Sequence, residues 1–402
     1  MRNNLTVFVV AALLVLATGT AVAQETTGGV TGSVSDEVGT PIAGAVIQAE
    51  GPYGTVSATT DDQGEYRFPR LTPGAYTVTA QLEGYAESSA EVRVVLGEMV
   101  TVSFALQRAT FEQEVTVYSD TVAIDFTESA TATSVREWEI EYLPRGRDFT
   151  DVVGMAAGAV VDNQAGGISI DGASGLENRY IIDGIDTTDP QIGDSSVPMR
   201  AEFMEEVQVK SAGYMAEYGG STGGVINAVT RSGRNAWHGG VLVDYENMDW
   251  NGSARPELEY SPCNRCETDD GRAEIVTYDK DDETRWDPGI FLGGPIVRDY
   301  LWFFGSYQPG IRNRKRTDDW NSYPADTYES EFQVDYATLN LTANIASSLL
   351  LKAGACVSPY KTEGLLPTRD GLSDLYEREN WAPLGTEGER ETYSLTADWI
   401  AT

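Results

Sequence analysis

The feature that most constrains this 402-residue chain is a strict alternation of apolar and polar side chains in its last third. The clearest run places Leu339, Leu341, Ala343 and Ile345 between Asn340, Thr342 and Asn344. The same period of two recurs over 349–357 and 393–399. Alternating side chains point to opposite faces of a β-strand. Strands with one apolar and one polar face are typical of a wall between lipid and a polar interior.

The connections between the strand-like runs alternate in length. Runs are predicted near 237–246, 287–294, 300–309, 332–345, 348–358 and 391–401. The connections are long at 247–286, short at 295–299, long at 310–331, short at 346–347 and long at 359–390. Outer-membrane barrels have short periplasmic turns and long extracellular loops. We therefore expect residues 235–402 to form the first strands of an incomplete transmembrane β-barrel.

The N-terminus has the layout of a secretory signal peptide. Arg2 precedes an apolar stretch over 7–17, and small residues follow at 21–23. That stretch of about 11 residues is far shorter than the ~20 that a transmembrane helix needs, and no later stretch is long enough either. We expect residues 1–23 to be removed after Ala23. A buried N-terminal helix is the alternative.

The composition argues against several functions. Lys and Arg total 28 against 62 Asp and Glu, a formal net charge of -34, so nucleic acid is disfavoured as a partner. His238 is the one histidine, and there are three cysteines, too few for a His-based zinc site or a Ser-His-Asp triad. We expect no enzyme, no cofactor and no metal, and a structural role for His238.

Residues 28–107 are predicted to form a β-sandwich, because short alternating runs are separated by turn residues. The predicted core includes Val34, Val46, Tyr66, Phe68, Tyr76 and Val78. The segments 32–36, 41–45, 64–68 and 71–76 resemble the carboxypeptidase regulatory-like domain. That resemblance implies a transthyretin-like sandwich without catalytic groups, of the kind that precedes the plug in large outer-membrane receptors.

Residues 110–234 combine short helical patterns with strand-like runs, which predicts an α+β unit. Ser134 and Glu137 have capping-box spacing, which predicts a short helix toward Leu143. A helical period follows at Phe149, Val152, Val153 and Ala156. After these come two strand-like runs that each end in Asp-Gly, and then a glycine-rich string.

This ordered set resembles the plug domain of TonB-dependent receptors. The motif residues are Asp171, Gly172, Asp183, Gly184, Tyr218, Gly219, Gly223, Gly224 and Asn227. Asp-Gly also ends strands simply because it favours turns, and Asp183 with Asp186 could instead bind a cation. The glycines over 219–224 lack the lysine of a phosphate loop, so we expect them to pack closely against a barrel wall.

The family resemblance implies an outer-membrane receptor and transporter. Such a protein binds a scarce extracellular solute, faces lipid with its barrel, and imports the solute to the periplasm with energy from TonB. The segment expected to bind the periplasmic C-terminal domain of TonB is Glu112, Gln113, Glu114, Val115, Thr116 and Val117, by addition of a strand to that partner. A plain linker strand is the alternative. The sandwich and plug would then lie on the periplasmic side.

Further alternatives remain at this stage. An outer-membrane-anchored adhesin without transport is the rival function, and a carboxypeptidase-like enzyme is disfavoured by the single histidine. Receptors of this family close about 22 strands, so the six predicted here indicate a fragment or a truncated product. In the first long loop, Cys263 and Cys266 are expected to form a small disulfide.

Overall fold

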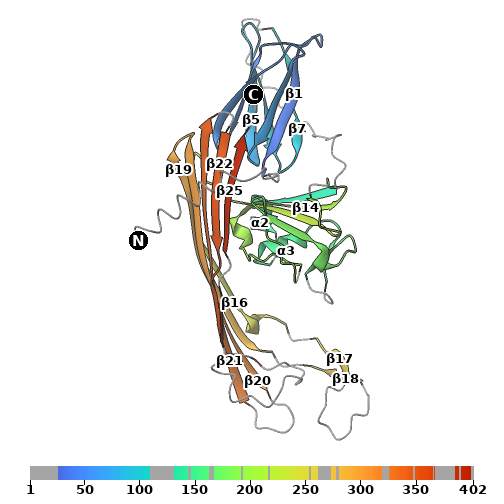
Figure 1. Cartoon of the computed structure of the whole chain (residues 1–402), viewed down its shortest axis with the longest axis vertical. Coiled ribbons are helices and arrows are strands. Elements are labelled where there is room, and N and C mark those ends of the chain that lie inside the picture. Colours follow the sequence, from blue (N-terminus) through green and yellow to red (C-terminus); the bar gives the residue numbers. More distant parts are fainter. Residues whose placement is uncertain are drawn as a thin grey trace.

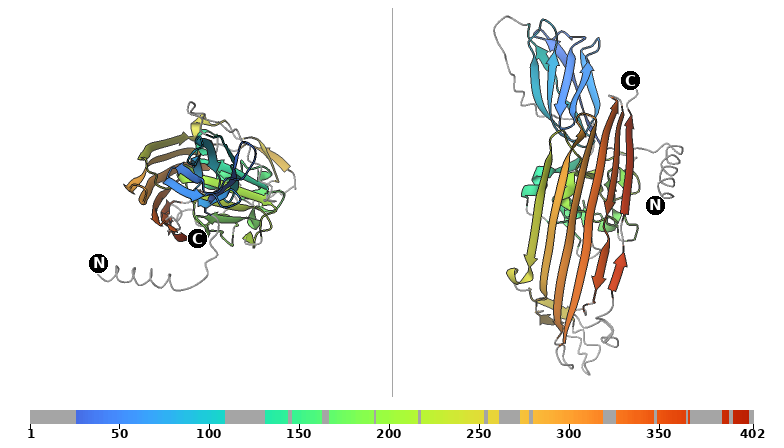
Figure 2. Two further views of the ribbon diagram at one scale, coloured as in Figure 1. Left: turned by 90° about the horizontal axis from the view of Figure 1, so that it is seen from above. Right: turned by 90° about the vertical axis from the view of Figure 1, so that its left-hand side faces the viewer.

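The computed structural model contains a β-sandwich, a compact α/β body and a tall curved sheet (Figure 1). The structure describes residues 26–108, 131–143, 146–162, 167–191, 193–215, 218–252, 255–260, 273–277, 280–318, 326–346, 349–364, 366, 385–388 and 391–399. The sandwich stands at one end of the long axis, and the tall sheet runs beside the α/β body and beyond it (Figures 1 and 2).

The sandwich is built from two four-stranded sheets. One contains β4 (Glu65–Leu71), β1 (Gly28–Asp36), β7 (Met99–Thr101) and β8 (Phe104–Leu106). The other has the order β3 (Gly54–Thr59), β2 (Val46–Gly51), β5 (Gly74–Gln81) and β6 (Ser88–Val94). The mainly-β fold class predicted for this region is thus confirmed.

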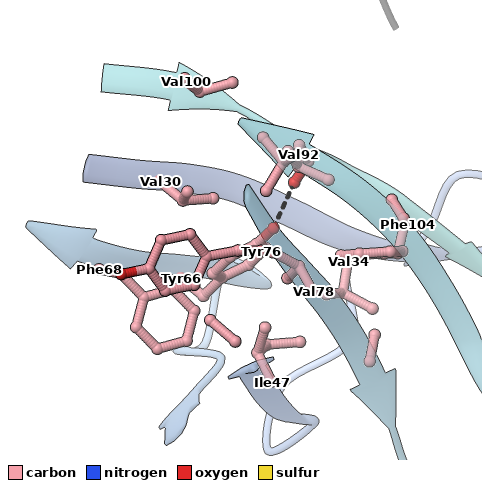
Figure 3. Packing of buried hydrophobic residues seen from close by; sticks show 14 of the residues in the cluster. Val30, Val34, Ile47, Tyr66, Phe68, Tyr76, Val78, Val92, Val100 and Phe104 are labelled. Carbon is pink, nitrogen blue, oxygen red and sulfur yellow. Dashed lines mark hydrogen bonds between the residues drawn. The ribbon is translucent and has the colours of Figure 1, made fainter. Parts of the chain in front are cut away.

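The inner faces of both sheets form one apolar core (Figure 3). Tyr66 lies among the valines of this core, and its hydroxyl donates to Val102 O at 2.6 Å, so the polar end of the ring is satisfied. The prediction of Val46 as a core residue was wrong, because its side chain is 39% exposed. Ile47 points inward instead, since side chains alternate along β2.

The α/β body is the plug. Its five-stranded sheet has the order β13 (Ile185–Asp186), β12 (Arg179–Ile182), β15 (Val225–Thr230), β14 (Met204–Ala212) and β9 (Thr131–Arg136). A small second sheet pairs β10 (Ala159–Val161) with β11 (Ile168–Ile170). The helical elements in the described part of the plug include α2 (Glu137–Tyr142), α3 (Phe149–Val153), and the single turns η1 (Gly175–Glu177) and η2 (Ala201–Phe203).

The start of the first plug helix differs from the prediction. Ser134 lies within β9, where it pairs with Gln208, so it cannot cap a helix. The N-cap is instead Arg136, whose backbone N–H donates to Glu139 Oε2 at 3.0 Å. The period predicted from Phe149 agrees with α3, although the helix ends at Val153 and Ala156 lies beyond it.

The tall sheet has the order β16 (His238–Asn247), β19 (Asp282–Val297), β20 (Leu301–Asp318), β21 (Asp326–Ala346), β22 (Leu349–Val357) and β25 (Glu391–Trp399). Two short strands extend it, β23 (Tyr360–Glu363) and β24 (Gly385–Gly388). Neighbouring strands are antiparallel, and the sheet is not closed within the described residues. The predicted long loop over 247–286 contains a turn, η4 (Met248–Trp250), and a hairpin of β17 (Glu257–Tyr260) with β18 (Ala273–Val276).

The two faces of the tall sheet differ as the alternation predicts. Leu339 and Leu341 on β21 are exposed, whereas Asn340 and Thr342 are buried on the side of the plug. β20 and β21 remain paired up to Asp318 and Asp326, so the prediction of a long connection over 310–331 was wrong. No helix in the described part of the chain is long and apolar enough to cross a membrane.

Candidate functional site

The two Asp-Gly motifs form turns of the plug. Asp183 and Gly184 have φ of 49° and 79° and join β12 to β13, where Ile182 pairs with Ile185. Two consecutive residues with positive φ are typical of a type I′ hairpin turn. Asp171 and Gly172 adopt similar backbone angles, 51° and 85°, directly after β11. Both motifs therefore place an Asp and a Gly in the left-handed backbone region at the end of a strand.

Asp183 also links the plug to the tall sheet. Its carboxylate accepts from the backbone N–H and the hydroxyl of Thr230, at 2.9 and 2.6 Å. Asn340 on β21 then donates to Thr230 Oγ1 at 2.7 Å and to the carbonyl of Arg231 at 2.7 Å. Burial raises the pKa of Asp183, although the bonds from Thr230 oppose this shift. The carboxylate is thus occupied by Thr230, and Asp186 by Arg179 at 3.0 Å.

The glycine-rich string packs inside the plug. A Cβ at Gly223 would lie 2.6 Å from Asn178 Oδ1 and 3.1 Å from Glu177 O. A Cβ at Gly224 would lie 2.3 Å from Ile170 Cδ1. The close approach is therefore to other plug residues, and our expectation of packing against a barrel wall was wrong for this pair.

The remaining motif residues lie near the same string. Tyr218 is buried, and the ammonium of Lys210 lies 4.6 Å from its ring centroid and 3.3 Å from its hydroxyl oxygen. The carbonyl of Gly219 accepts from Arg179 Nη1 at 2.6 Å. Asn227 is fully buried in β15. Most of the motif residues thus lie on or beside β12, β14 and β15, whereas Asp171 and Gly172 follow β11.

A charged cluster joins the plug to the concave side of the tall sheet, and the sequence analysis missed it. Asp287 on β19 is fully buried and forms ion pairs with Arg147 and Arg200 of the plug, the latter at 3.2 Å. Arg285 approaches the same carboxylate at 3.1 Å. Arg200 also holds Asp148 at 3.0 Å. We call Arg147, Asp148, Arg200, Arg285 and Asp287 the inner cluster.

A second charged cluster lies where the chain leaves the plug for the tall sheet. Glu137 of α2 accepts from Arg231 at 2.8 Å and from Arg234 at 2.7 Å. Arg234 also contacts Glu205 at 2.8 Å. Burial alone would raise the pKa of Glu137, but Arg231 and Arg234 lower it. Two arginines, Arg231 and Arg234, follow directly after the apolar strand β15, and this pattern in the sequence could have indicated a charged site.

The other predictions concerned the segment expected to bind TonB, the cysteine pair, His238 and metal binding. The segment 112–117 and the pair Cys263 and Cys266 lie outside the described residues. His238 stacks on Phe304 with ring centroids 6.1 Å apart and contacts the carbonyl of Ala236. Across the described ranges, no group of three or more His, Cys, Asp or Glu is arranged to hold a metal ion.

Comparison with known proteins agrees with this architecture. Residues 29–107 match the family described as carboxypeptidase regulatory-like domain. The chain is similar to the TonB-dependent transporter Oar of Myxococcus xanthus, with 33% identity over 300 residues. The match covers 71% of this chain but only 27% of that relative, so the chain spans a minor part of its length.

The solved structures that are similar to this chain include receptors and transporters. A mutant form of the ferric enterobactin receptor of Pseudomonas aeruginosa has 17% identity and a TM-score of 0.47, over 68% of this chain and 39% of that one. The outer membrane transporter YddB from Escherichia coli has 18% identity and a TM-score of 0.45, over 59% and 34%.

Sandwich, plug and tall sheet, together with the similarity to Oar, place the chain in the class of TonB-dependent outer-membrane receptors. Within that class it is similar to Oar, and its own regulatory-like domain precedes the plug.

Proposed function

We propose that the protein imports a scarce extracellular solute across the outer membrane of a Gram-negative bacterium, with energy that TonB supplies. In this proposal the signal peptide is cleaved near Ala23, and the sandwich, over 28–107, and the plug, over 110–234, lie on the periplasmic side. The apolar face of 235–402 contacts lipid. The protein has no catalytic role.

The observation that carries the proposal is the polar character of the plug's attachments to the tall sheet. The inner cluster and the bonds of Asn340 to Thr230 and Arg231 are ion pairs and hydrogen bonds. Polar groups released from such contacts can bond to water, so the plug could move with a smaller penalty than an apolar interface would impose. A barrier held in this way suits a gate that opens on demand.

The coupling step is assigned to residues 112–117, which lie outside the described part of the chain. An extended peptide that adds a strand to a partner's sheet gains main-chain hydrogen bonds with little demand on sequence. Val115→Pro removes one backbone donor and restricts φ, whereas Thr116→Ala keeps the donor. The two variants therefore form a matched pair.

The experiment compares solute uptake and solute binding in cells that carry the receptor in the outer membrane. Val115→Pro should abolish uptake and leave binding unchanged, while Thr116→Ala should behave like the wild type. Wild-type uptake in Val115→Pro would reject 112–117 as the coupling segment. If removal of residues 111–120 also leaves uptake intact, the TonB-dependent import itself is rejected, and binding without uptake in the wild type would favour an adhesin.

A further inference from the structure

The sandwich contacts the plug through the turn between β6 and β7. Leu96 in this turn is fully buried, and its backbone N–H donates to Glu206 Oε2 at 3.3 Å. Its carbonyl accepts from Gln208 Nε2 at 2.7 Å. Glu206 and Gln208 lie two residues apart on β14, so they project from the same face of the strand. Both backbone groups of one sandwich residue are thus bonded by one plug strand.

The same side chains reach the neighbouring strand. Gln208 Nε2 also lies 3.4 Å from Ser134 Oγ on β9, and Ser134 is the residue paired with Gln208 in the sheet. Glu206 and Gln208 are only 3% and 1% exposed. Water therefore cannot replace these bonds unless the contact opens. We call Leu96, Ser134, Glu206 and Gln208 the latch cluster.

The position of β9 makes this cluster mechanically important. Among the described strands, β9 pairs with β14 alone and forms the edge of the plug sheet. In the chain, β9 starts at Thr131, after the sandwich and after the segment expected to bind TonB. A force that pulls on that segment would be transmitted to the sandwich on its N-terminal side and to β9, at Thr131, on its C-terminal side. The latch cluster connects the sandwich to β9.

A second contact fixes the sandwich to the tall sheet. The N–H of Asn235 donates to Pro52 O at 2.9 Å, in the turn between β2 and β3. The next residue, Tyr53, packs edge-to-face on Trp302 of β20, with ring centroids 5.6 Å apart. Asn235 Oδ1 accepts from Trp302 Nε1 at 2.8 Å, which holds the indole in place. The sandwich is therefore tied to the tall sheet as well as to the plug.

We propose that the regulatory-like sandwich is a latch for the plug: anchored to the tall sheet at Pro52 and Tyr53, it keeps β9 on β14 through Leu96, Glu206 and Gln208 until the contact is pulled apart. The source of the pull rests on the import function proposed above. The restraint on β9 does not, and it can be measured in the absence of TonB.

The test is hydrogen exchange of the whole chain in detergent, without TonB, read at the amides of β9. Leu96→Glu places a second carboxyl beside Glu206 and should detach the sandwich. Gln208→Leu removes the amide that joins Leu96 to Ser134. Each variant should speed exchange of β9 by about tenfold, the change expected for loss of one buried hydrogen bond. Val38→Glu, at an exposed sandwich position, is the matched control and should have no effect.

The double variant shows whether the two residues act as one unit. If the sandwich restrains β9 through Gln208, Gln208→Leu should add little once Leu96→Glu has detached it. Effects that multiply would mean that Gln208 acts only within the plug sheet, and the proposal would be wrong. Wild-type exchange of β9 in both single variants would also overturn it. Amides of β5 report on sandwich folding, and if Leu96→Glu unfolds the sandwich, wild-type exchange of β9 in Gln208→Leu would still overturn the proposal.

The same variants separate the latch from the import function. Faster exchange of β9 in the latch variants, together with uptake that does not change when residues 112–117 are altered or removed, would support the latch and reject TonB coupling. Uptake that depends on residues 112–117, together with unchanged exchange of β9 in the latch variants, would support TonB coupling and reject the latch.

Discussion

Arg200 of the plug donates to Asp287 of the tall sheet at 3.2 Å, and both side chains are fully buried. The same guanidinium lies 4.2 Å from the ring centroid of Tyr336 on β21. Because Arg147 and Arg285 also contact the Asp287 carboxylate, three cations share this one acidic group, and Asp148 contacts only Arg200 among them. Removing one partner of a buried ion pair is costly because it leaves an uncompensated charge. The plug therefore depends on Asp287 more than on any one arginine of the inner cluster.

Asp287→Asn should weaken the attachment of the plug by about 3 kcal/mol, since the guanidinium groups lose their shared counter-charge. The expected result is faster hydrogen exchange in α3, whose N-cap residue Asp148 is bonded to Arg200. Asp335→Asn is the control, because Asp335 contacts Tyr307 on the outer face of the same sheet. Equal exchange in α3 for both variants would contradict this role of Asp287.

Gly223→Ala should destabilise the plug by about 1–3 kcal/mol, the usual cost of forcing an extra carbon into a packed site. The new Cβ would meet Asn178 Oδ1 and the backbone oxygen of Glu177, and backbone cannot move aside easily. Gly252→Ala adds the same group where nothing lies within 4 Å and serves as the control. Thermal unfolding monitored at β15 should shift for the first variant only.

Much of the fold could be predicted because one physical rule controls it. Where one face of a strand is apolar and the other polar, the period of two is visible, as at Leu339, Asn340 and Leu341. The rule fails beyond 310 on β20, where Arg312, Arg314 and Arg316 alternate with other polar residues. Both faces are then hydrophilic, so a paired strand has the composition of a loop.

The candidate site was predicted less well, because its bonds join residues far apart in the chain. Asp287 and Arg200 are 87 positions apart, and nothing near either residue indicates the other. The sequence singled out the motif glycines, but the residues that pack against Gly223 and Gly224 were not predicted. Gly224 lies against Ile170, a contact that exists only after β11 and β15 have been placed in the plug.

Asp183 offers a pair of substitutions that separate its backbone conformation from its hydrogen bonds. Asp183→Asn keeps an acceptor for Thr230 and tolerates the left-handed φ of 49°, so it should cost about 1 kcal/mol or less. Asp183→Ala loses both bonds and adds backbone strain, and it should cost about 2–4 kcal/mol. Exchange of the Thr230 amide should rank the proteins in that order. Similar rates for the two variants would show that the bonds to Thr230 do not matter.

Docking of the sandwich on the plug should weaken as the pH rises, because of Glu206. Burial raises the pKa of this carboxyl from its usual value to about 7, and Glu98 of the sandwich adds to the effect. Ser134, the Leu96 N–H and Arg136 on β9 act in the opposite direction. Lys210, on the same face of β14, is bonded to Tyr218. When the sandwich detaches, the carboxyl meets water and regains its ordinary pKa.

The sign of the pH effect follows from these two values. Below the ordinary pKa, Glu206 is protonated in both states and docking carries no penalty. As the pH rises toward 7, the detached state loses its proton first, so docking becomes progressively weaker and levels off above that value. Exchange of β9, corrected for the intrinsic effect of pH, should therefore speed up between about pH 5 and 7. Glu206→Gln is neutral at every pH and should remove this slope. If the slope persists in Glu206→Gln, another group controls the contact.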